Sequence, residues 1–325
     1  MPTLSCCSPV RPLARLLGLA VLCACAVAHA QSGRPIRMVV PLPPGSSNDA
    51  VARALAPPMA QILGQPVVVD NKAGGNGLIG TMEVVRAAPD GSTLLAGSNS
   101  PLAANVAFVK NLPYDLKKDI TPIAGMAQTH WVLLVKPAAP LRSFADFVSY
   151  AKQRPGKVSV GYSTTAVQTQ IATINKLAGV QLLAVPYKGT PATLTDVIGG
   201  TLDATLVDPG NASAQVKGGT LKALAVSSIR RNPYFPDWPA ISETLPDYDF
   251  RAWNALVGPA GMARDQVTRL ASAVNEALKS PDVARHYQSA GSNVMVMGPE
   301  ELRRFIDAET DKWARLAKEA NIQPE

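Results

Sequence analysis

The feature that most constrains this 325-residue chain is a regular alternation of short apolar segments with longer amphipathic ones. Short apolar runs bounded by Gly and Pro indicate strands, and the amphipathic stretches between them indicate helices. Strands that alternate with helices form mainly parallel sheets, so the sequence predicts an α/β fold. The expected strands are 36–40, 66–70 and 92–97, then a second set of 130–136, 157–162, 181–185, 204–208 and 221–226, and a further strand at 250–257.

The first expected strand ends in a loop rich in hydrogen-bond donors. Three prolines and a glycine stop the apolar run, and helix-forming residues begin at Ala50. Hydroxyls and free backbone N–H groups at the start of a helix suit a carboxylate or a phosphate. The alternative is that one of the polar residues only caps the helix. The loop consists of Gly45, Ser46, Ser47, Asn48 and Asp49.

Residues 1–30 have the pattern of an export signal. Arg11 and Arg15 precede an apolar run, and Ala28 and Ala30 provide the small residues of a cleavage site. We therefore expect a signal peptide that is cleaved after Ala30. All four cysteines lie in this segment, so the mature chain would have no disulfide and no thiolate metal site. Cys25 could alternatively be a lipid-attachment residue.

The charge of the mature chain argues against one class of partner. Removal of residues 1–30 takes away two arginines and no acids, so the formal net charge falls from +7 to +5. The remaining basic residues are scattered, and only 5% of the residues are aromatic. Nucleic-acid binding is therefore not expected.

A glycine motif leaves a nucleotide-binding enzyme open as an alternative. Gly75, Gly77 and Gly80 match G-x-G-x-x-G between an expected strand and an expected helix. The next strand, however, lacks the acid that would hold a ribose hydroxyl, and the glycines also suit a tight turn. His130 and His286 have no acid, nucleophile or second metal ligand at a telling spacing. We therefore expect no catalytic residues, no cofactor and no metal, with an NAD-dependent or hydrolytic α/β enzyme as the alternative.

Polar side chains gather where the expected strands end. The carboxyl ends of parallel strands are where α/β proteins bind their ligands. Hydroxyls, amides, one lysine and acids at these ends would suit a small polar molecule. Beyond the first loop, the candidate binding residues are Ser98, Asn99, Tyr162, Ser163, Thr164, Thr165, Gln168, Tyr187, Lys188 and Asp208.

A series of motifs in a fixed order resembles one known family. The motifs are the 34–45 segment with Asp49, the 64–72 segment with its glycines, the 88–91 turn, Leu112-Pro-Tyr-Asp115, and the 185–189, 221–226 and 258–261 segments. Together they cover nearly the whole mature chain. The chain is therefore similar to the substrate-binding proteins of tripartite tricarboxylate transporters, also called Bug receptors.

The resemblance implies an exported, periplasmic and monomeric receptor with the two-lobe architecture of type II periplasmic binding proteins. One lobe would comprise residues 31–128 with 253–325 and the other residues 129–252, joined by two crossing hinge segments. The lobes would close on a small carboxylate and deliver it to the membrane permease subunits of the transporter. In this family the carboxylate is held by the loop after the first strand and by a second-lobe loop, which correspond here to residues 45–49 and 163–168.

The second-lobe loop departs from the family pattern. Family members usually have a longer segment rich in Ser and Gly that ends in His, whereas residues 163–168 are shorter, lack glycine and place Gln168 near that histidine. Asp208 matches an acid at the end of a second-lobe strand, where it could accept from a ligand amino or hydroxyl group. The identity of the carboxylate stays open, and a role as the partner of a sensor is a further alternative.

Overall fold

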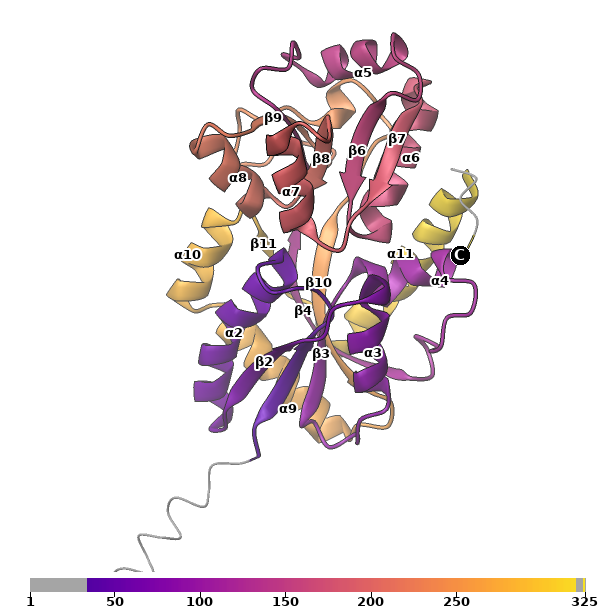
Figure 1. Cartoon of the computed structure of the whole chain (residues 1–325). Helices are drawn as coiled ribbons and strands as arrows, with labels where there is room; N and C mark the ends of the chain where they lie inside the picture. The colour runs from indigo at the N-terminus through magenta and orange to yellow at the C-terminus, as the bar shows by residue number, and fades with distance from the viewer. Residues whose placement is uncertain (1–33, 320–323, 325) are drawn as a thin grey trace, which may run out of the picture.

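The chain forms two β-sheets, which lie one above the other in the computed structural model (Figure 1). The structure describes residues 34–319 and residue 324, so the expected signal peptide and Cys25 lie outside the described residues. The first sheet has the strand order β11-β4-β10-β3-β1-β2. Its strands are β1 (Ile36–Val40), β2 (Val67–Asn71), β3 (Thr93–Ser98), β4 (Ile120–Thr129), β10 (Ala252–Pro259) and β11 (Asn293–Val294).

The second sheet has the strand order β7-β6-β8-β5-β9. Its strands are β5 (Val132–Val135), β6 (Val158–Tyr162), β7 (Leu182–Pro186), β8 (Ala204–Val207) and β9 (Lys222–Val226). In the first sheet β10 runs antiparallel to both of its neighbours, and in the second sheet β5 does so. Each sheet is therefore mixed around a parallel set, and the two-sheet α/β fold expected from the sequence is confirmed.

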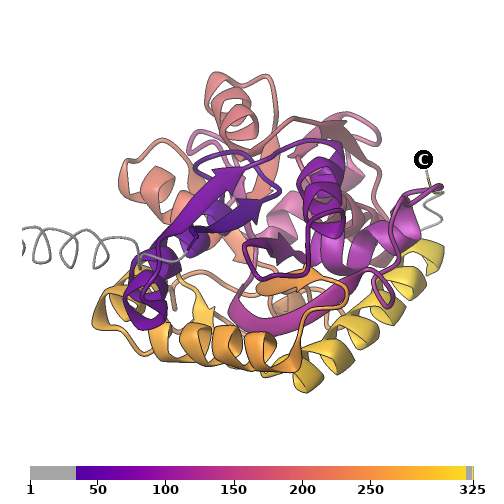
Figure 2. The ribbon, with the colours of Figure 1, turned by 90° about the horizontal axis from the view of Figure 1, so that it is seen from below.

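Helices flank both sheets, and we call the parts around the first and second sheets lobe 1 and lobe 2. Figure 2 shows α9, α10 and α11 wrapping round one side of lobe 1. The helices of lobe 1 are α2 (Ser47–Leu63), α3 (Leu78–Val85), α4 (Asn105–Phe108), α9 (Arg264–Ala277), α10 (Pro281–Ser289) and α11 (Pro299–Glu319). Those of lobe 2 are α5 (Phe144–Lys152), α6 (Thr165–Ala178), α7 (Thr190–Gly199) and α8 (Pro209–Lys217).

The first strand shows how the sequence builds the core of lobe 1. Met38 and Val40 belong to the apolar cluster that contains α2 and α9, whereas Val39 belongs to the cluster that contains α3 and α11. Successive side chains of a strand point to opposite faces of its sheet. A continuous apolar run is therefore required here, because helices cover both faces of β1.

The chain crosses between the sheets twice, and the two crossings lie side by side. It leaves the first sheet after Thr129 and enters the second at Val132, and it returns after Val226 to re-enter at Ala252. Thr129 is paired with Ala252 in the first sheet, and Val132 is paired with Val226 in the second. The covalent connection between the lobes therefore consists of two adjacent segments of chain.

One side of the boundary between the lobes is packed with apolar side chains. Phe250, in the second crossing, contacts Trp313 of α11 with ring centroids 5.7 Å apart. Tyr248 is fully buried, and its hydroxyl donates to Oε1 of Gln170 in α6 at 3.1 Å. These contacts join α6 to α11 on the right of Figure 1.

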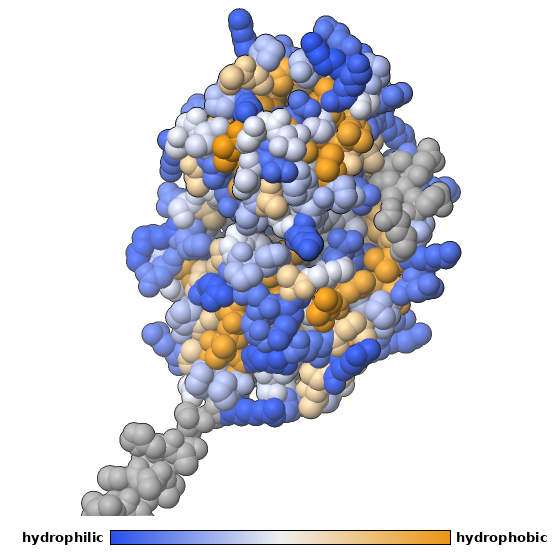
Figure 3. All heavy atoms as spheres, viewed as in Figure 1, coloured by the Kyte–Doolittle hydropathy of each residue, from blue (hydrophilic) through white to orange (hydrophobic). Residues whose placement is uncertain are grey.

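The surface is mixed in character. Figure 3 shows hydrophilic residues over most of one face, with apolar residues in separate small groups. Scattered apolar side chains of this kind are ordinary on a protein surface. Within residues 34–319, no helix is both long and apolar enough to cross a membrane.

Candidate functional site

A small cavity lies between the two lobes, next to the crossings. Its volume of about 80 Å³ is well below the roughly 300 Å³ at which drug-sized pockets begin, so only a small molecule would fit. The residues that line it are Leu42, Ser46, Ser47, Asn48, Ser98, Asn99, Ser100, Trp131, Ser163, Thr164, Ala166, Val167, Thr190, Leu206, Val207, Asp208, Ala252, Trp253 and Asn254.

The start of α2 forms the lobe 1 side of this cavity. Ser46 is the N-cap, and its Oγ accepts from the backbone N–H of Asp49 at 3.3 Å. The first N–H groups of a helix have no partner within it, so those of Ser47 and Asn48 can donate to a group outside the helix. The side chain of Asn48 is held in place because its Nδ2 donates to the carbonyl of Ala96 at 2.8 Å.

Asp49 orders this loop. Its Oδ2 accepts from the backbone N–H of Gly45 at 3.0 Å, and its Oδ1 accepts from Nε of Arg53 at 2.9 Å. Burial alone would raise the pKa of Asp49, but the hydrogen bonds from Arg53 and Gly45 outweigh it and lower the pKa below its usual value. Both carboxylate oxygens of Asp49 therefore accept hydrogen bonds from Gly45 and Arg53, and Asp49 does not line the cavity.

The start of α6 faces α2 from lobe 2. Thr164 is the N-cap, and its Oγ1 accepts from the backbone N–H of Val167 at 3.3 Å. The expectation that residues 163–168 form a loop was wrong, because α6 begins at Thr165 and Gln168 lies in its first turn. Ser163 and Thr164 therefore line the cavity as the cap of a helix.

Asp208 follows β8 and is the N-cap of α8. Its Oδ1 accepts from the backbone N–H of Asn211 at 3.0 Å, and its Oδ2 accepts from Nδ2 of Asn211 at 2.7 Å. Pro209 follows at the first helical position, where it offers no N–H. The α8 side of the cavity therefore presents a hydrogen-bond acceptor, whereas α2 and α6 present donors.

Eight of the fifteen candidate residues from the sequence line the cavity, namely Ser46, Ser47, Asn48, Ser98, Asn99, Ser163, Thr164 and Asp208. The other seven lie nearby or elsewhere. Thr165 is buried, with its Oγ1 3.5 Å from Oδ1 of Asn105, and Tyr162 ends β6 one residue before Ser163. The hydroxyl of Tyr187 donates to Asp196, and Lys188 is exposed. Gly45, Asp49 and Gln168 belong to the two helix starts already described.

Several lining residues were not anticipated from the sequence. Trp131 lies in the first crossing, and Trp253 and Asn254 lie at the start of β10 after the second. The indole of Trp253 is fixed, because its Nε1 donates to Oε2 of Glu309 in α11 at 2.9 Å. The expected crossing segments could have identified these three residues, because both crossings pass beside a cavity between the lobes.

The electrostatics of the cavity favour an anion at one end. Among its lining residues Asp208 is the one with a charged side chain, and no lysine or arginine lines it. The N-termini of α2 and α6 carry partial positive charge and free N–H groups, which stabilise a carboxylate. In the described residues no group of three or more His, Cys, Asp or Glu side chains could hold a metal ion.

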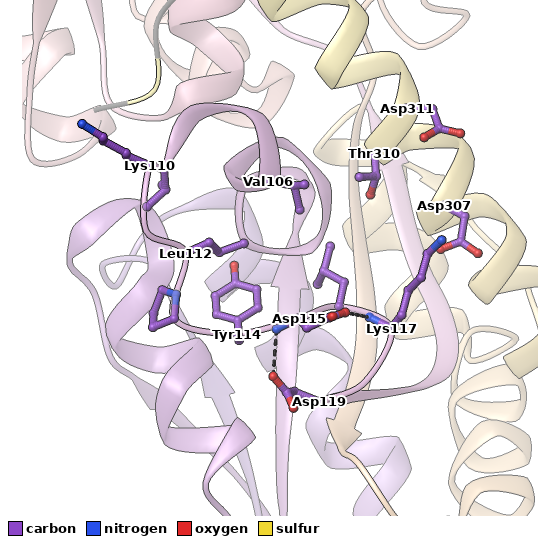
Figure 4. Close-up of a pocket in the computed structure, with 13 residues that line it drawn as sticks. Val106, Lys110, Leu112, Tyr114, Asp115, Lys117, Asp119, Asp307, Thr310 and Asp311 are labelled. Atoms are coloured by element: carbon purple, nitrogen blue, oxygen red, sulfur yellow. Dashed lines mark hydrogen bonds between the residues drawn. The ribbon is translucent and has the colours of Figure 1, made fainter.

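A second hollow, with a volume of about 680 Å³, lies on the flank of lobe 1 beside α11 (Figure 4). It includes the Leu112-Pro-Tyr-Asp115 motif. Oδ2 of Asp119 accepts from the backbone N–H of Asp115, and Oδ1 of Asp115 accepts from that of Lys117, each at 2.8 Å. These carboxylates stabilise the turns in which they lie, and no two helix starts converge on this hollow. The candidate site is therefore the cavity between the lobes.

The glycine motif has a structural explanation. Gly77 has φ +88°, which favours glycine, and a Cβ on Gly80 would lie 3.0 Å from the carbonyl oxygen of Lys72 and 3.1 Å from Cα of Pro41. These glycines let α3 approach the β1 loop closely. The motif therefore does not require a bound dinucleotide.

Comparison with known proteins identifies the family. A family model described as the tripartite tricarboxylate transporter family receptor matches residues 51–322. The chain belongs to this receptor family. Among its relatives, the protein BugT of Bordetella pertussis is 33% identical over 294 residues, which are 89% of this chain and 90% of that protein. The resemblance stated from the sequence is thus confirmed, and the enzyme alternative is set aside because the family consists of transport receptors.

Solved structures agree with this assignment. The Rhodopseudomonas palustris protein Rpa4515 with adipate has a TM-score of 0.87 and 29% identity, covering 91% of this chain and 100% of that one. The periplasmic binding protein BugD has a TM-score of 0.85 and 29% identity, covering 90% and 99%. MatC from Rhodopseudomonas palustris, with bound malate, has a TM-score of 0.81 and 29% identity, covering 87% and 99%. The chain is therefore a solute-binding receptor whose structural neighbours include carboxylate-bound proteins.

Proposed function

We propose that this receptor is exported to the periplasm and binds a small carboxylate between its two lobes. The observation that carries the proposal is the meeting of the capped starts of α2 and α6 across one small cavity. The signal pattern of residues 1–30 supports export. Adipate and malate in the neighbouring structures support a carboxylate ligand.

The free energy of burying a carboxylate explains why these groups are needed. A carboxylate loses water when it is buried, and hydrogen bonds must replace that water. N–H groups of Ser47 and Asn48 and hydroxyls of Ser46, Ser47 and Ser163 would supply such bonds from both lobes. A ligand held from both sides favours the closed arrangement by its differential affinity for the two states.

Hinge closure about the two crossings is the second part of the proposal. Residues 31–128 with 253–325 would move as one body and residues 129–252 as the other. The apolar packing of Phe250 against Trp313 supports this, because it restricts movement on one side of the boundary. The closed, loaded receptor would then deliver the carboxylate to the permease subunits of a tripartite transporter.

The experiment is a thermal-shift and calorimetric screen of the mature protein against small carboxylates. A ligand at a hundred times its dissociation constant should stabilise the protein by roughly 2.7 kcal/mol. The decisive variant is Ser47→Pro, since Ser47 is the first helical residue and Ser46 is extended with ψ 158°, as a residue before proline should be. This change removes the N–H and keeps the helix, whereas the control Ser47→Ala removes only the hydroxyl.

We expect Ser47→Pro to weaken carboxylate binding about tenfold or more, the cost of a lost charge-assisted hydrogen bond. Ser47→Ala should weaken it less. Equal affinities for the wild-type protein and the proline variant would remove the start of α2 from the binding site. A screen in which no carboxylate stabilises the wild-type protein would contradict the proposed function.

A further inference from the structure

Three polar residues at the strand ends of lobe 1 line the cavity beside the start of α2. Ser98 ends β3, Ser100 lies two residues further on, and Asn254 in β10 is paired with Ser98 in the sheet. Directly opposite residues of an antiparallel pair have neighbouring side chains on the same face of the sheet. Ser98 and Asn254 therefore lie together, and we call Ser98, Ser100 and Asn254 the strand wall.

The hydrogen bonds of Asn48 determine which end of the Asn254 amide remains free. The carbonyl of Ala96 can only accept, so the atom of Asn48 that lies 2.8 Å from it is the donor Nδ2. Oδ1 of Asn48 is then an acceptor, and it accepts from Nδ2 of Asn254 at 2.7 Å. Oδ1 of Asn254 is therefore the free end of the amide, and it accepts no hydrogen bond within the described chain.

The free polar atoms of the strand wall are accessible although their residues are largely buried. The exposed fractions are 3% for Ser100 and 7% for Asn254, and both residues line the cavity. Oγ of Ser100 and Oδ1 of Asn254 have no partner within residues 34–319, but neither is among the unpartnered atoms there that are closed to solvent. Because the rest of each residue is buried, the open part is the part that faces the cavity.

The strand wall matches one functional group. Oδ1 of Asn254 can only accept, whereas the hydroxyls of Ser98 and Ser100 can also donate. A ligand hydroxyl has one donor and two lone pairs, so it can donate to Asn254 and accept from a serine at the same time. An ammonium group has no lone pair and carries a charge that no residue of the strand wall balances. A second carboxylate has no donor for Oδ1 of Asn254.

The size of the cavity determines where on the ligand this hydroxyl must lie. Its volume of about 80 Å³ is less than that of three water molecules in the liquid, at roughly 30 Å³ each. Such a space holds a carboxylate with about one or two further carbons. The bond between Asn48 and Asn254 also joins the start of α2 directly to the strand wall. The hydroxyl must therefore be on the carbon next to the carboxylate.

We propose that the strand wall is a hydroxyl-binding subsite and that the receptor selects a short α-hydroxycarboxylate. The ligand hydroxyl would donate to Oδ1 of Asn254 and accept from Oγ of Ser100, while the carboxylate lies at the starts of α2 and α6. A ligand that displaces water from these atoms without replacing its hydrogen bonds loses affinity. This inference rests on the proposed function, because it assumes that a carboxylate binds in this cavity.

The test uses four three-carbon carboxylates that differ at the carbon next to the carboxylate. Propionate has no polar group there, pyruvate has a carbonyl, lactate has a hydroxyl and alanine has an ammonium group, and both enantiomers of the last two would be included. Calorimetry would give dissociation constants for the wild-type protein, Ser100→Ala and Asn254→Ala. Ser272→Ala is the matched control, because Ser272 is exposed on α9 of lobe 1 and does not line the cavity.

We expect one enantiomer of lactate to bind the wild-type protein about tenfold more tightly than pyruvate or propionate, as one added hydrogen bond would give. Ser100→Ala should reduce this preference and leave the affinity for propionate unchanged, because the lost hydroxyl has no partner within the described chain. Asn254→Ala should weaken every ligand, since it also frees Asn48. The readout for that variant is therefore the ratio of lactate to pyruvate affinity, which should fall toward one, and Ser272→Ala should change nothing.

Several results would overturn the inference and leave the proposed function intact. These are tightest binding by alanine, equal affinities of the wild-type protein for lactate and pyruvate, and an unchanged lactate preference in either folded variant. Binding of longer carboxylates alone would also overturn it. Failure of every carboxylate, short or long, to bind the wild-type protein would overturn the proposed function and this inference together. Thermal melting of each variant would show that it is folded.

Discussion

Nδ2 of Asn254 donates to Oδ1 of Asn48 at 2.7 Å, across 206 residues of sequence. This bond joins the start of α2 to β10, the strand that follows the second crossing. Both side chains are almost fully buried, with exposed fractions of 1% for Asn48 and 7% for Asn254. The loop that we propose to bind the carboxylate is therefore positioned by the same strand that carries the chain back from lobe 2.

Replacement of Asn254 by alanine should destabilise the protein. It would leave Oδ1 of Asn48 buried without a donor, which costs about 1–3 kcal/mol. Urea unfolding would measure the change, and a double-mutant cycle with Asn48→Ala would isolate the coupling between the two side chains. Additive effects of the two substitutions would show that the bond does not contribute.

Asp49→Ala should reduce both stability and ligand affinity, although Asp49 does not line the cavity. The substitution frees the N–H of Gly45 and the guanidinium of Arg53, at a cost of about 1–3 kcal/mol in unfolding free energy. Arg53→Ala should cost less, because the Arg53 side chain is 54% exposed and surface ion pairs are weak. Calorimetry and thermal unfolding would separate the two effects, and a larger loss in Arg53→Ala would contradict this view of the loop.

Stability should fall as the pH decreases from about 6.5 to about 4, and His130 should account for much of the fall. Burial lowers the pKa of His130 from 6.5 to about 4, so in this range the unfolded chain binds a proton that the folded chain does not. Folded-state stability is therefore fully present above pH 6.5 and is lost toward pH 4, by at most about 3 kcal/mol. Nδ2 of Asn232 lies 3.3 Å from Nε2 of His130, where a neutral ring can accept a hydrogen bond from it.

The measurement is urea unfolding at several pH values for the wild-type protein and His130→Gln. The variant should show a smaller decrease over this range. Some decrease should remain, because burial also lowers the pKa of His286. An identical pH profile for both proteins would show that His130 is not responsible.

Gly80→Ala should destabilise the protein by about 1–3 kcal/mol, as overpacking usually does. The two atoms nearest to the added Cβ are the backbone carbonyl oxygen of Lys72 and Cα of Pro41, which cannot rotate away. Gly199→Ala is the control, since a Cβ there would meet nothing within 4 Å. Unfolding midpoints would compare them, and an equally mild effect at both positions would disprove the packing role of Gly80.

The start of α2 shows what the sequence could predict. A strand stopped by prolines, followed by Ser46 and a helix-forming segment, defines a capped helix start from local signals alone. The sequence analysis predicted a loop at residues 163–168, whereas α6 begins at Thr165. The polar residues of its first turn are as typical of a loop as of a helix start. Asn254 and Trp131 were not found, because their contacts join segments that are distant in the sequence.

The pairing of Thr129 with Ala252 and of Val132 with Val226 has a consequence for how the molecule can be divided. Lobe 2 enters and leaves through neighbouring strands, so it is an insertion whose two ends already meet. Its continuous piece of chain could be cut out for expression on its own, and lobe 1 could be closed behind it with a short turn. A reporter domain could likewise be grafted at this junction, where the described chain passes between the lobes in two adjacent segments.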